Sequence, residues 1–155
     1  YDFDFLERAV QMIRESKDHR PAIVVGSKRA EGANDNRSLL RRLATFAFSS
    51  LLKFGFGLGV SDTHGVKAMH RSSVSDIEKH CAFTVDLFDT ELILRCERNG
   101  IIVSEIPVTV EESRPARSNL ISRIPRTLLG LTKMRFLFFY VAIFRRNELR
   151  PVKLK

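Results

Sequence analysis

The chain has 155 residues, of which 44% are hydrophobic, and a formal net charge of +8. This length supports one hydrophobic core and is too short for two independent ones, so we expect a single domain or part of a larger one. Cys81 and Cys96 lack Cys-x-x-Cys or His-x-x-His spacing, which argues against a disulfide framework and a zinc site and predicts two buried, reduced thiols in a cytosolic protein.

The positive charge is concentrated toward the C-terminus. Residues 114–155 carry eleven Lys or Arg and one acid, whereas the first 113 residues have a net charge of −2. Such a segment can face nucleic acid, an anionic membrane or water. Its apolar run from Phe136 to Phe144 has nine residues, less than half of what a bilayer core requires. The chain opens with three acids among its first seven residues, unlike a secretory signal.

The first elements in chain order are a helix, a buried strand and a loop. Apolar residues recur at helical spacing over residues 4–17, which predicts an amphipathic helix. Ala22 to Val25 form a wholly apolar run closed by Gly26, the pattern of a strand buried on both faces. Residues 26–36 are rich in Gly, Asn and Asp and predict a loop.

The middle of the chain predicts three helices and one short strand. Ser38 is a suitable N-cap for a helix over residues 39–56, which a cluster of glycines ends. Residues 66–69 predict a short strand and residues 72–80 a short helix. A longer helix is expected over residues 88–99, where Asn-Gly is a common helix stop.

The last elements are a strand and a long helical segment. Residues 101–110 are the clearest strand, and Pro107 places it near an edge or a bulge of the sheet. Residues 118–147 are mostly helical, with an expected interruption at Pro125. The alternation of helices and strands predicts an α/β fold.

Two places in the chain could meet a phosphate. Lys28 and Arg29 follow the buried strand, and ligands of open α/β sheets bind beyond the carboxyl ends of strands. Solvated basic loop residues are the alternative. Arg41 and Thr45 are four residues apart, so they share a helix face and could hold one anion together. A surface arginine and a core-facing threonine explain that spacing equally well.

Two further groups of polar residues have structural and functional interpretations. In the segment around His64, Asp62 can bond nearby backbone N–H groups, and Gly65 can take a conformation that other residues avoid. His64 could act at such a site, but a histidine without a positioned partner is more often structural. Asp89 can cap the helix that follows it, with Glu91 in the first turn near the positive end of the helix dipole.

Five segments with these features stand in a fixed order: VVGSKRAEGA, RSLLRRLAT, SDTHGVKAMHR, FDTELILRCERNGIIVSEIPVTVEE and RPARSNLISRIPR. Together they resemble the second half of the family 2 glycosyltransferases, particularly the dolichyl-phosphate mannosyl- and glucosyltransferase-like branch. The resemblance implies a partial GT-A fold, which is nucleotide-diphospho-sugar transferase or Rossmann-like, with a mixed sheet, flanking helices and a C-terminal amphipathic helix. It makes residues 1–117 the C-terminal part of a catalytic domain and residues 118–155 a basic, membrane-interfacial helical segment.

The resemblance also implies an activity and its partners. A sugar would pass with inversion from a nucleotide sugar to a polyprenyl or dolichyl phosphate, in a peripheral protein at the cytoplasmic face of a membrane. The Asp-x-Asp that holds the divalent metal, Mg²⁺ or Mn²⁺, is expected upstream of Tyr1. Asp2 and Asp4 resemble the region just after it, or a helix cap, so the chain is expected to be an inactive fragment that binds no metal itself.

Site residues follow from the resemblance position by position. Asp62 matches an acid with a catalytic or organising role, and Lys28, Arg41 and Thr45 match the groups that cradle the acceptor phosphate. His64 stands where Gln is more common and can supply one hydrogen bond at the site. Lys28 replaces the usual Arg, and therefore offers a point charge instead of a planar fork. An anionic acceptor requires clamping and charge compensation more than a strong base.

The basic C-terminal segment is compatible with two functions of the protein. In the glycosyltransferase, residues 120–147 would present Leu, Ile and Phe to the bilayer boundary while Arg and Lys meet anionic headgroups. A core-packing helix with a solvated basic end has the same pattern. The second is a basic module without catalysis that binds a membrane surface or nucleic acid through residues 114–155. That module gives the first 113 residues no task, so a nucleotide sugar, a lipid phosphate and a membrane are the expected partners, and nucleic acid is not.

Overall fold

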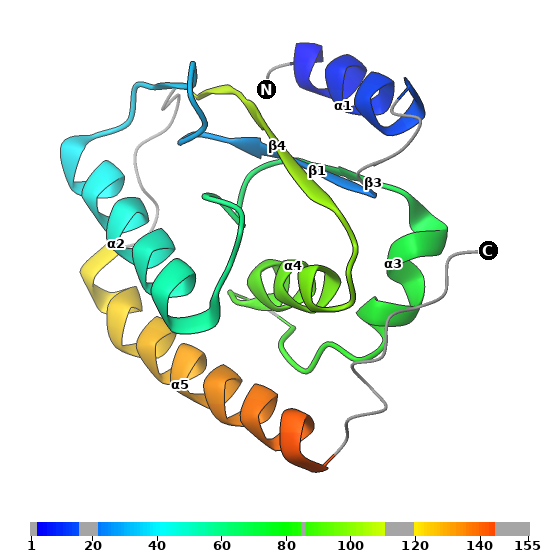
Figure 1. Cartoon of the computed structure of the whole chain (residues 1–155). Coiled ribbons are helices and arrows are strands. Elements are labelled where there is room, and N and C mark those ends of the chain that lie inside the picture. Colours follow the sequence, from blue (N-terminus) through cyan, green and yellow to red (C-terminus); the bar gives the residue numbers. More distant parts are fainter. Residues whose placement is uncertain (1–2, 16–21, 85, 111–119, 145–155) are drawn as a thin grey trace.

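The computed structural model describes residues 3–15, 22–84, 86–110 and 120–144 (Figure 1). Its elements are α1 (Phe3–Glu15), β1 (Ile23–Ser27), β2 (Asn34–Asp35), α2 (Leu39–Phe56), β3 (Lys67–Met69), α3 (Arg71–Glu78), α4 (Phe88–Arg98), β4 (Val103–Pro107), β5 (Thr109–Val110) and α5 (Leu120–Phe144). The predicted order of helices and principal strands is confirmed. The short strand β2 lies in the segment for which only a loop was predicted.

The three-stranded sheet is mixed, as predicted, and has the order β3-β1-β4. Its central strand, β1, is antiparallel to β3 and parallel to β4. Ser27 at the end of β1 is paired with Pro107 at the end of β4. Within the described residues β4 lies at an edge of the sheet, so the expected edge position of Pro107 is confirmed. A second, two-stranded sheet joins β2 and β5 in parallel.

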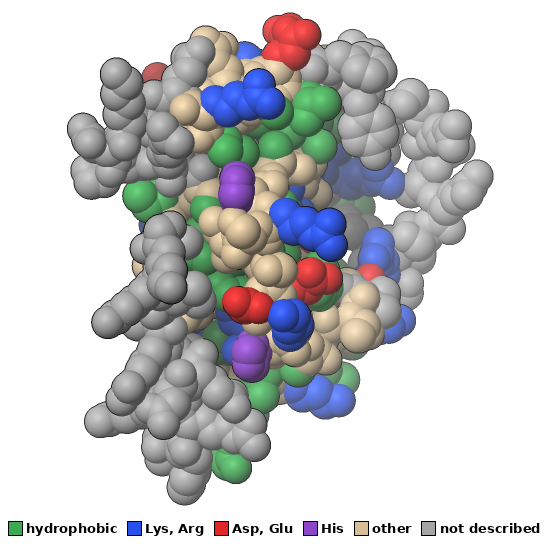
Figure 2. Space-filling model, turned by 90° about the vertical axis from the view of Figure 1, so that its right-hand side faces the viewer, with side chains coloured by type: hydrophobic (Ala, Val, Ile, Leu, Met, Phe, Trp, Pro, Cys, Tyr) green, Lys and Arg blue, Asp and Glu red, His purple; other side chains and the backbone are tan. Residues whose placement is uncertain are grey.

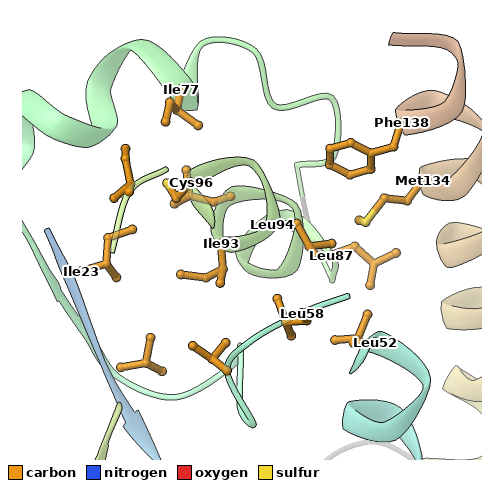
Figure 3. Close-up of a cluster of buried hydrophobic side chains, with 14 of the residues drawn as sticks. Ile23, Leu52, Leu58, Ile77, Leu87, Ile93, Leu94, Cys96, Met134 and Phe138 are labelled. Carbon is orange, nitrogen blue, oxygen red and sulfur yellow. The ribbon is translucent and has the colours of Figure 1, made fainter. Parts of the chain in front are cut away.

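Alternate residues of β1 enter two hydrophobic clusters on opposite sides of the sheet. Ile23 and Val25 belong to a large cluster with side chains from α2, α3, α4 and α5, in which α4 is central (Figure 3). Val24 belongs to a smaller cluster with Phe5 and Ala9 of α1. Successive strand residues point to opposite faces, and both faces of β1 are covered. This explains why the strand is a continuous apolar run.

Two glycines allow the loop before β3 to approach the end of β1. A Cβ atom at Gly65 would overlap the backbone carbonyl of Gly26. A Cβ atom at Gly26 would lie 2.8 Å from side-chain atoms of Val66 and Val108. The positive φ angles among the described residues are at other glycines, so the predicted special conformation of Gly65 is wrong. Its glycine is required by the close approach of two backbones.

Helix α5 continues through Pro125, so the predicted interruption there is wrong. Pro125 is the sixth residue of the helix. A proline this close to the start removes one hydrogen bond to the preceding turn and leaves most of the helix intact. In the described part of the chain, none of the helices combines the length and the apolarity needed to cross a bilayer.

Candidate functional site

Two loops meet at the carboxyl end of β1 and form a nearly buried ion pair. Lys28 Nζ, one residue beyond β1, lies 3.0 Å from Asp62 Oδ2 in the loop before β3. The side chains of Lys28 and Asp62 are 16% and 4% exposed. The structure therefore brings together two predicted site residues at the end of the sheet where ligands of α/β proteins bind.

A network of hydrogen bonds fixes the loop that carries Asp62. Asp62 Oδ1 accepts a hydrogen bond of 2.9 Å from the backbone N–H of His64, which confirms the predicted turn. Glu105 of β4 accepts through one carboxylate oxygen from the Asp62 N–H and the Ser61 hydroxyl, both at 3.0 Å. Ser61 also contacts the buried Ser27 hydroxyl at 2.9 Å. The two adjacent strands thus hold Asp62 in place.

The surroundings of Asp62 favour its ionised form. Burial is the largest influence and raises the pKa of Asp62, because it removes water from the carboxylate. The charge and hydrogen bonding of Lys28 and the N–H of His64 lower that pKa, and together they outweigh burial. The pKa of Asp62 lies below 3.8, its ordinary value, so the residue is an anion at neutral pH.

His64 has a partner on each ring nitrogen, which corrects its description as a histidine without a positioned partner. Its Nε2 lies 3.0 Å from the backbone carbonyl of Asp86, and its Nδ1 lies 3.1 Å from the Thr63 hydroxyl. A carbonyl only accepts, so Nε2 carries the proton, and in the neutral ring Nδ1 accepts from Thr63. The ring also meets the ring of Phe48 on α2 edge to face, with centroids 5.4 Å apart.

Arg41 and Thr45 lie on the same face of α2 as Phe48, at positions i, i+4 and i+7. The Thr45 hydroxyl donates to the Arg41 carbonyl at 2.9 Å and is 3.3 Å from the donating guanidinium of Arg37. Its proton is therefore used within the helix. Direct contacts join Lys28, Asp62 and His64, and the Phe48–His64 contact connects this loop to the face of α2 that carries Arg41 and Thr45.

Asp89 and Glu91, the two acids at the start of α4, have different roles in the structure. Asp89 does not cap the helix, because the N-cap position is Leu87, without a side-chain bond. Asp89 instead pairs with Lys67 at 3.2 Å. Glu91 is fully buried and accepts hydrogen bonds of 2.8 Å from the N–H groups of Ala82 and Phe83 and from Arg95. Glu91 therefore holds the loop before α4 in place. Its position in the first turn of the helix did not predict these hydrogen bonds.

The exposed faces of α2 and α5 are unusually apolar. These helices carry 12 of the 17 exposed large hydrophobic side chains among the described residues. We call these 12 the outer apolar face: Leu39, Leu40, Leu43, Phe46, Leu51, Phe54, Ile124, Leu128, Leu129, Phe136, Phe139 and Tyr140. Neither helix contains Asp or Glu. The inner side of α5 meanwhile packs into the large cluster through Leu131, Met134 and Phe138, so this helix both packs into the core and exposes apolar residues.

Other parts of the surface are more polar. Figure 2 shows the side of α1 and α3, where basic and acidic side chains lie among one another. Among the described residues, the exposed cations on the acid-free helices are Arg42, Lys53, Arg123, Arg126, Lys133 and Arg135. The outer apolar face is thus accompanied by positive charge that no acid of the same helix offsets.

A groove of about 560 Å³ lies between α5 and the loop that precedes α4. Its lining includes Phe83, Leu129 and Lys133. Asp86 also lines it and pairs with Arg123 of α5 at 2.7 Å, while its carbonyl accepts from His64. Through these two contacts, Asp86 connects the loop of His64 to the start of α5.

The resemblance implies a divalent metal held by residues upstream of Tyr1. The described residues contain no group of three or more His, Cys, Asp or Glu side chains able to hold a metal ion. Asp62, the buried acid of the site, is neutralised by Lys28. The chain matches no protein-family model, no curated protein and no solved structure.

Proposed function

We propose that this chain is the acceptor-binding part of a GT-A type glycosyltransferase that transfers a sugar from a nucleotide sugar to a polyprenyl phosphate. The observation that carries the proposal is the nearly buried Lys28–Asp62 pair at the carboxyl end of β1. An ionised acid held at this position, next to a helix with an apolar outer face, suits a reaction between a polar donor and a lipid phosphate.

The chemistry requires little acid–base catalysis. A phosphate oxygen of the acceptor attacks the anomeric carbon of the sugar, and the bond from that carbon to the nucleotide diphosphate breaks with inversion. The nucleophile is already an anion, so the protein's task is to orient it and to compensate charge. Asp62 orders the turn that presents His64, and Thr63 and Asp86 fix the histidine ring. Arg41 and Thr45 remain the predicted groups on the α2 side of the acceptor.

The outer apolar face supports delivery of the acceptor at a membrane surface. Amphipathic helices of this composition lie in the interface, with apolar residues at the boundary of the acyl chains and cations near anionic headgroups. Phe54 is 88% exposed and Phe136 is 69% exposed, which is costly in water unless another surface covers them. The protein is therefore proposed to be peripheral to a membrane, and the resemblance implies the cytoplasmic side.

The test is binding of the chain to vesicles. Phosphatidylcholine vesicles containing polyprenyl phosphate are compared with vesicles in which phosphatidylglycerol supplies the same surface charge. We expect tighter sedimentation with the polyprenyl phosphate vesicles. Equal binding to the two kinds of vesicle would count against a specific lipid acceptor. In membranes with the full-length protein, Asp62→Asn should abolish sugar transfer while the protein remains folded.

A second candidate function is a basic module without catalysis. The outer apolar face favours a membrane surface over nucleic acid, because contacts with nucleic acid phosphates require mainly cations and hydrogen-bond donors. Binding to an oligonucleotide with a steep loss of affinity as salt increases would favour nucleic acid. Neither version gives the buried Lys28–Asp62 pair a task, which is why we place the enzyme first.

A further inference from the structure

The cation predicted to meet the acceptor phosphate is already engaged. Lys28 lies 3.0 Å from Asp62, and both side chains are nearly buried. A phosphate that drew Lys28 away would leave a buried carboxylate without its cation, which is unfavourable. Lys28 is therefore suited to positioning Asp62, and the grip on a phosphate requires another group.

Arg29, the next residue, has the properties that this grip requires. Its guanidinium donates to the backbone carbonyl of Phe46 on α2 at 3.4 Å and lies over the Phe46 ring, 4.7 Å from the centroid. The backbone N–H of Arg29 donates to the buried Ser27 hydroxyl at 3.1 Å, and this bond fixes the position of the Arg29 backbone. Among the described residues, no carboxylate forms an ion pair with Arg29.

The position of Phe46 indicates which phosphate Arg29 would meet. Phe46 is 57% exposed and belongs to the outer apolar face of α2. Arg29 thus lies at the border between the loop after β1 and an apolar surface suited to a lipid chain. A guanidinium has several N–H donors left when one is used, and its planar fork matches two phosphate oxygens.

We propose that Arg29 binds the phosphate of a lipid acceptor, and that Lys28 holds Asp62. This inference rests on the proposed function and changes the residue that recognises the acceptor. The ligand class is a phosphate monoester with an apolar isoprenoid chain, which would lie along α2 from Phe46. Arg29 supplies the planar fork that Lys28 lacks.

The test titrates the chain with a short-chain isoprenyl monophosphate, and separately with inorganic phosphate, by isothermal calorimetry. The variants are Arg29→Ala, Arg29→Lys and, as a control of equal charge, Arg14→Ala on the exposed side of α1. Arg29→Ala should weaken isoprenyl phosphate binding by about tenfold or more, as for loss of charge-assisted hydrogen bonds. Arg29→Lys should recover only part of the affinity, and Arg14→Ala should bind like the unsubstituted chain.

Each of the other possible results of these titrations would contradict a different part of the proposal. If Arg29→Ala binds isoprenyl phosphate as well as Arg14→Ala does, Arg29 is not the phosphate ligand. If inorganic phosphate binds as tightly as isoprenyl phosphate, the apolar chain is not recognised and the lipid class is wrong. If the unsubstituted chain binds neither ligand, the proposed function itself fails. Arg29 is partly buried, and matching unfolding midpoints of the variants would show that each remains folded.

Discussion

Removing the positive charge of Lys28 tests whether the ion pair at the end of β1 is a structural unit. In Lys28→Met, the carboxylate of Asp62, which is 4% exposed, loses its cation. Removing one partner of a buried pair costs about 3–5 kcal/mol. Asp62 retains the hydrogen bond from the His64 N–H, and Lys28 is 16% exposed. We therefore expect a loss near the lower end, about 3 kcal/mol in the free energy of unfolding at pH 7.

The pH dependence of this loss gives a second check. In the native chain the pKa of Asp62 is below 3.8, so its ionised form stabilises the fold at neutral pH, and that contribution is lost on acidification through the folded pKa. Without Lys28, burial should raise the pKa of Asp62 above its ordinary value. The variant then loses stability as pH rises. The difference between the two proteins should therefore be largest at neutral pH and shrink in acid.

Urea unfolding followed by circular dichroism at neutral and acidic pH measures this difference. Lys79→Met is the matched control, because Lys79 pairs with Asp76 at 2.8 Å but both side chains are exposed. We expect no resolvable change in that control. An equal effect of the two substitutions, or a loss in Lys28→Met that does not change with pH, would refute the account of a buried pair.

Three further predictions concern the support of the site. Gly65→Ala should destabilise the fold by about 3 kcal/mol or more, because the new methyl group overlaps the Gly26 carbonyl. Gly55→Ala, in the last turn of α2 where a Cβ atom would meet open space, should stabilise the fold by about 0.5–1 kcal/mol. Thermal unfolding measures both changes, and similar shifts would contradict the close approach of Gly65 to Gly26. Glu91→Gln should cost about 3 kcal/mol in urea unfolding because Arg95 loses its buried anion, and a change under about 0.5 kcal/mol would contradict this role. Cys96 is buried, whereas Cys81, which was predicted to be buried, is partly exposed. Burial raises the pKa of each thiol to about 12, so both should be alkylated by iodoacetamide far more slowly at pH 8 than in urea. Fast alkylation of Cys96 in the native chain would contradict its burial.

Local sequence patterns predicted the elements well because each pattern has a direct physical cause. The apolar run of β1 predicted a strand that is buried on both faces of the sheet, and α1 and α4 cover these two faces. The predicted helix over residues 39–56 matches α2 at both ends. Pro125 was the exception, because a proline near the start of a long helix removes only one hydrogen bond.

The contacts of the site were predictable only where neighbours in sequence make them. The bond from the His64 N–H to Asp62 spans two residues and follows from turn chemistry. The Lys28–Asp62 and Asp89–Lys67 pairs join residues more than 20 positions apart, and composition does not reveal such pairs. Glu105 was missed for the same reason, since its partners Ser61 and Asp62 lie in a loop more than 40 positions earlier. The bond between the Thr63 and Thr90 hydroxyls was missed likewise.

The most direct test of the central claim is to map the binding of a short-chain isoprenyl monophosphate on the ¹⁵N-labelled chain by nuclear magnetic resonance. We expect chemical-shift changes around the end of β1 at Lys28 and Arg29, around Asp62 and His64, and along α2 near Thr45. Changes at all three places would show that the lipid phosphate binds where the loops meet. Changes confined to α5 and the basic residues after it, or none at a large excess of ligand, would contradict it.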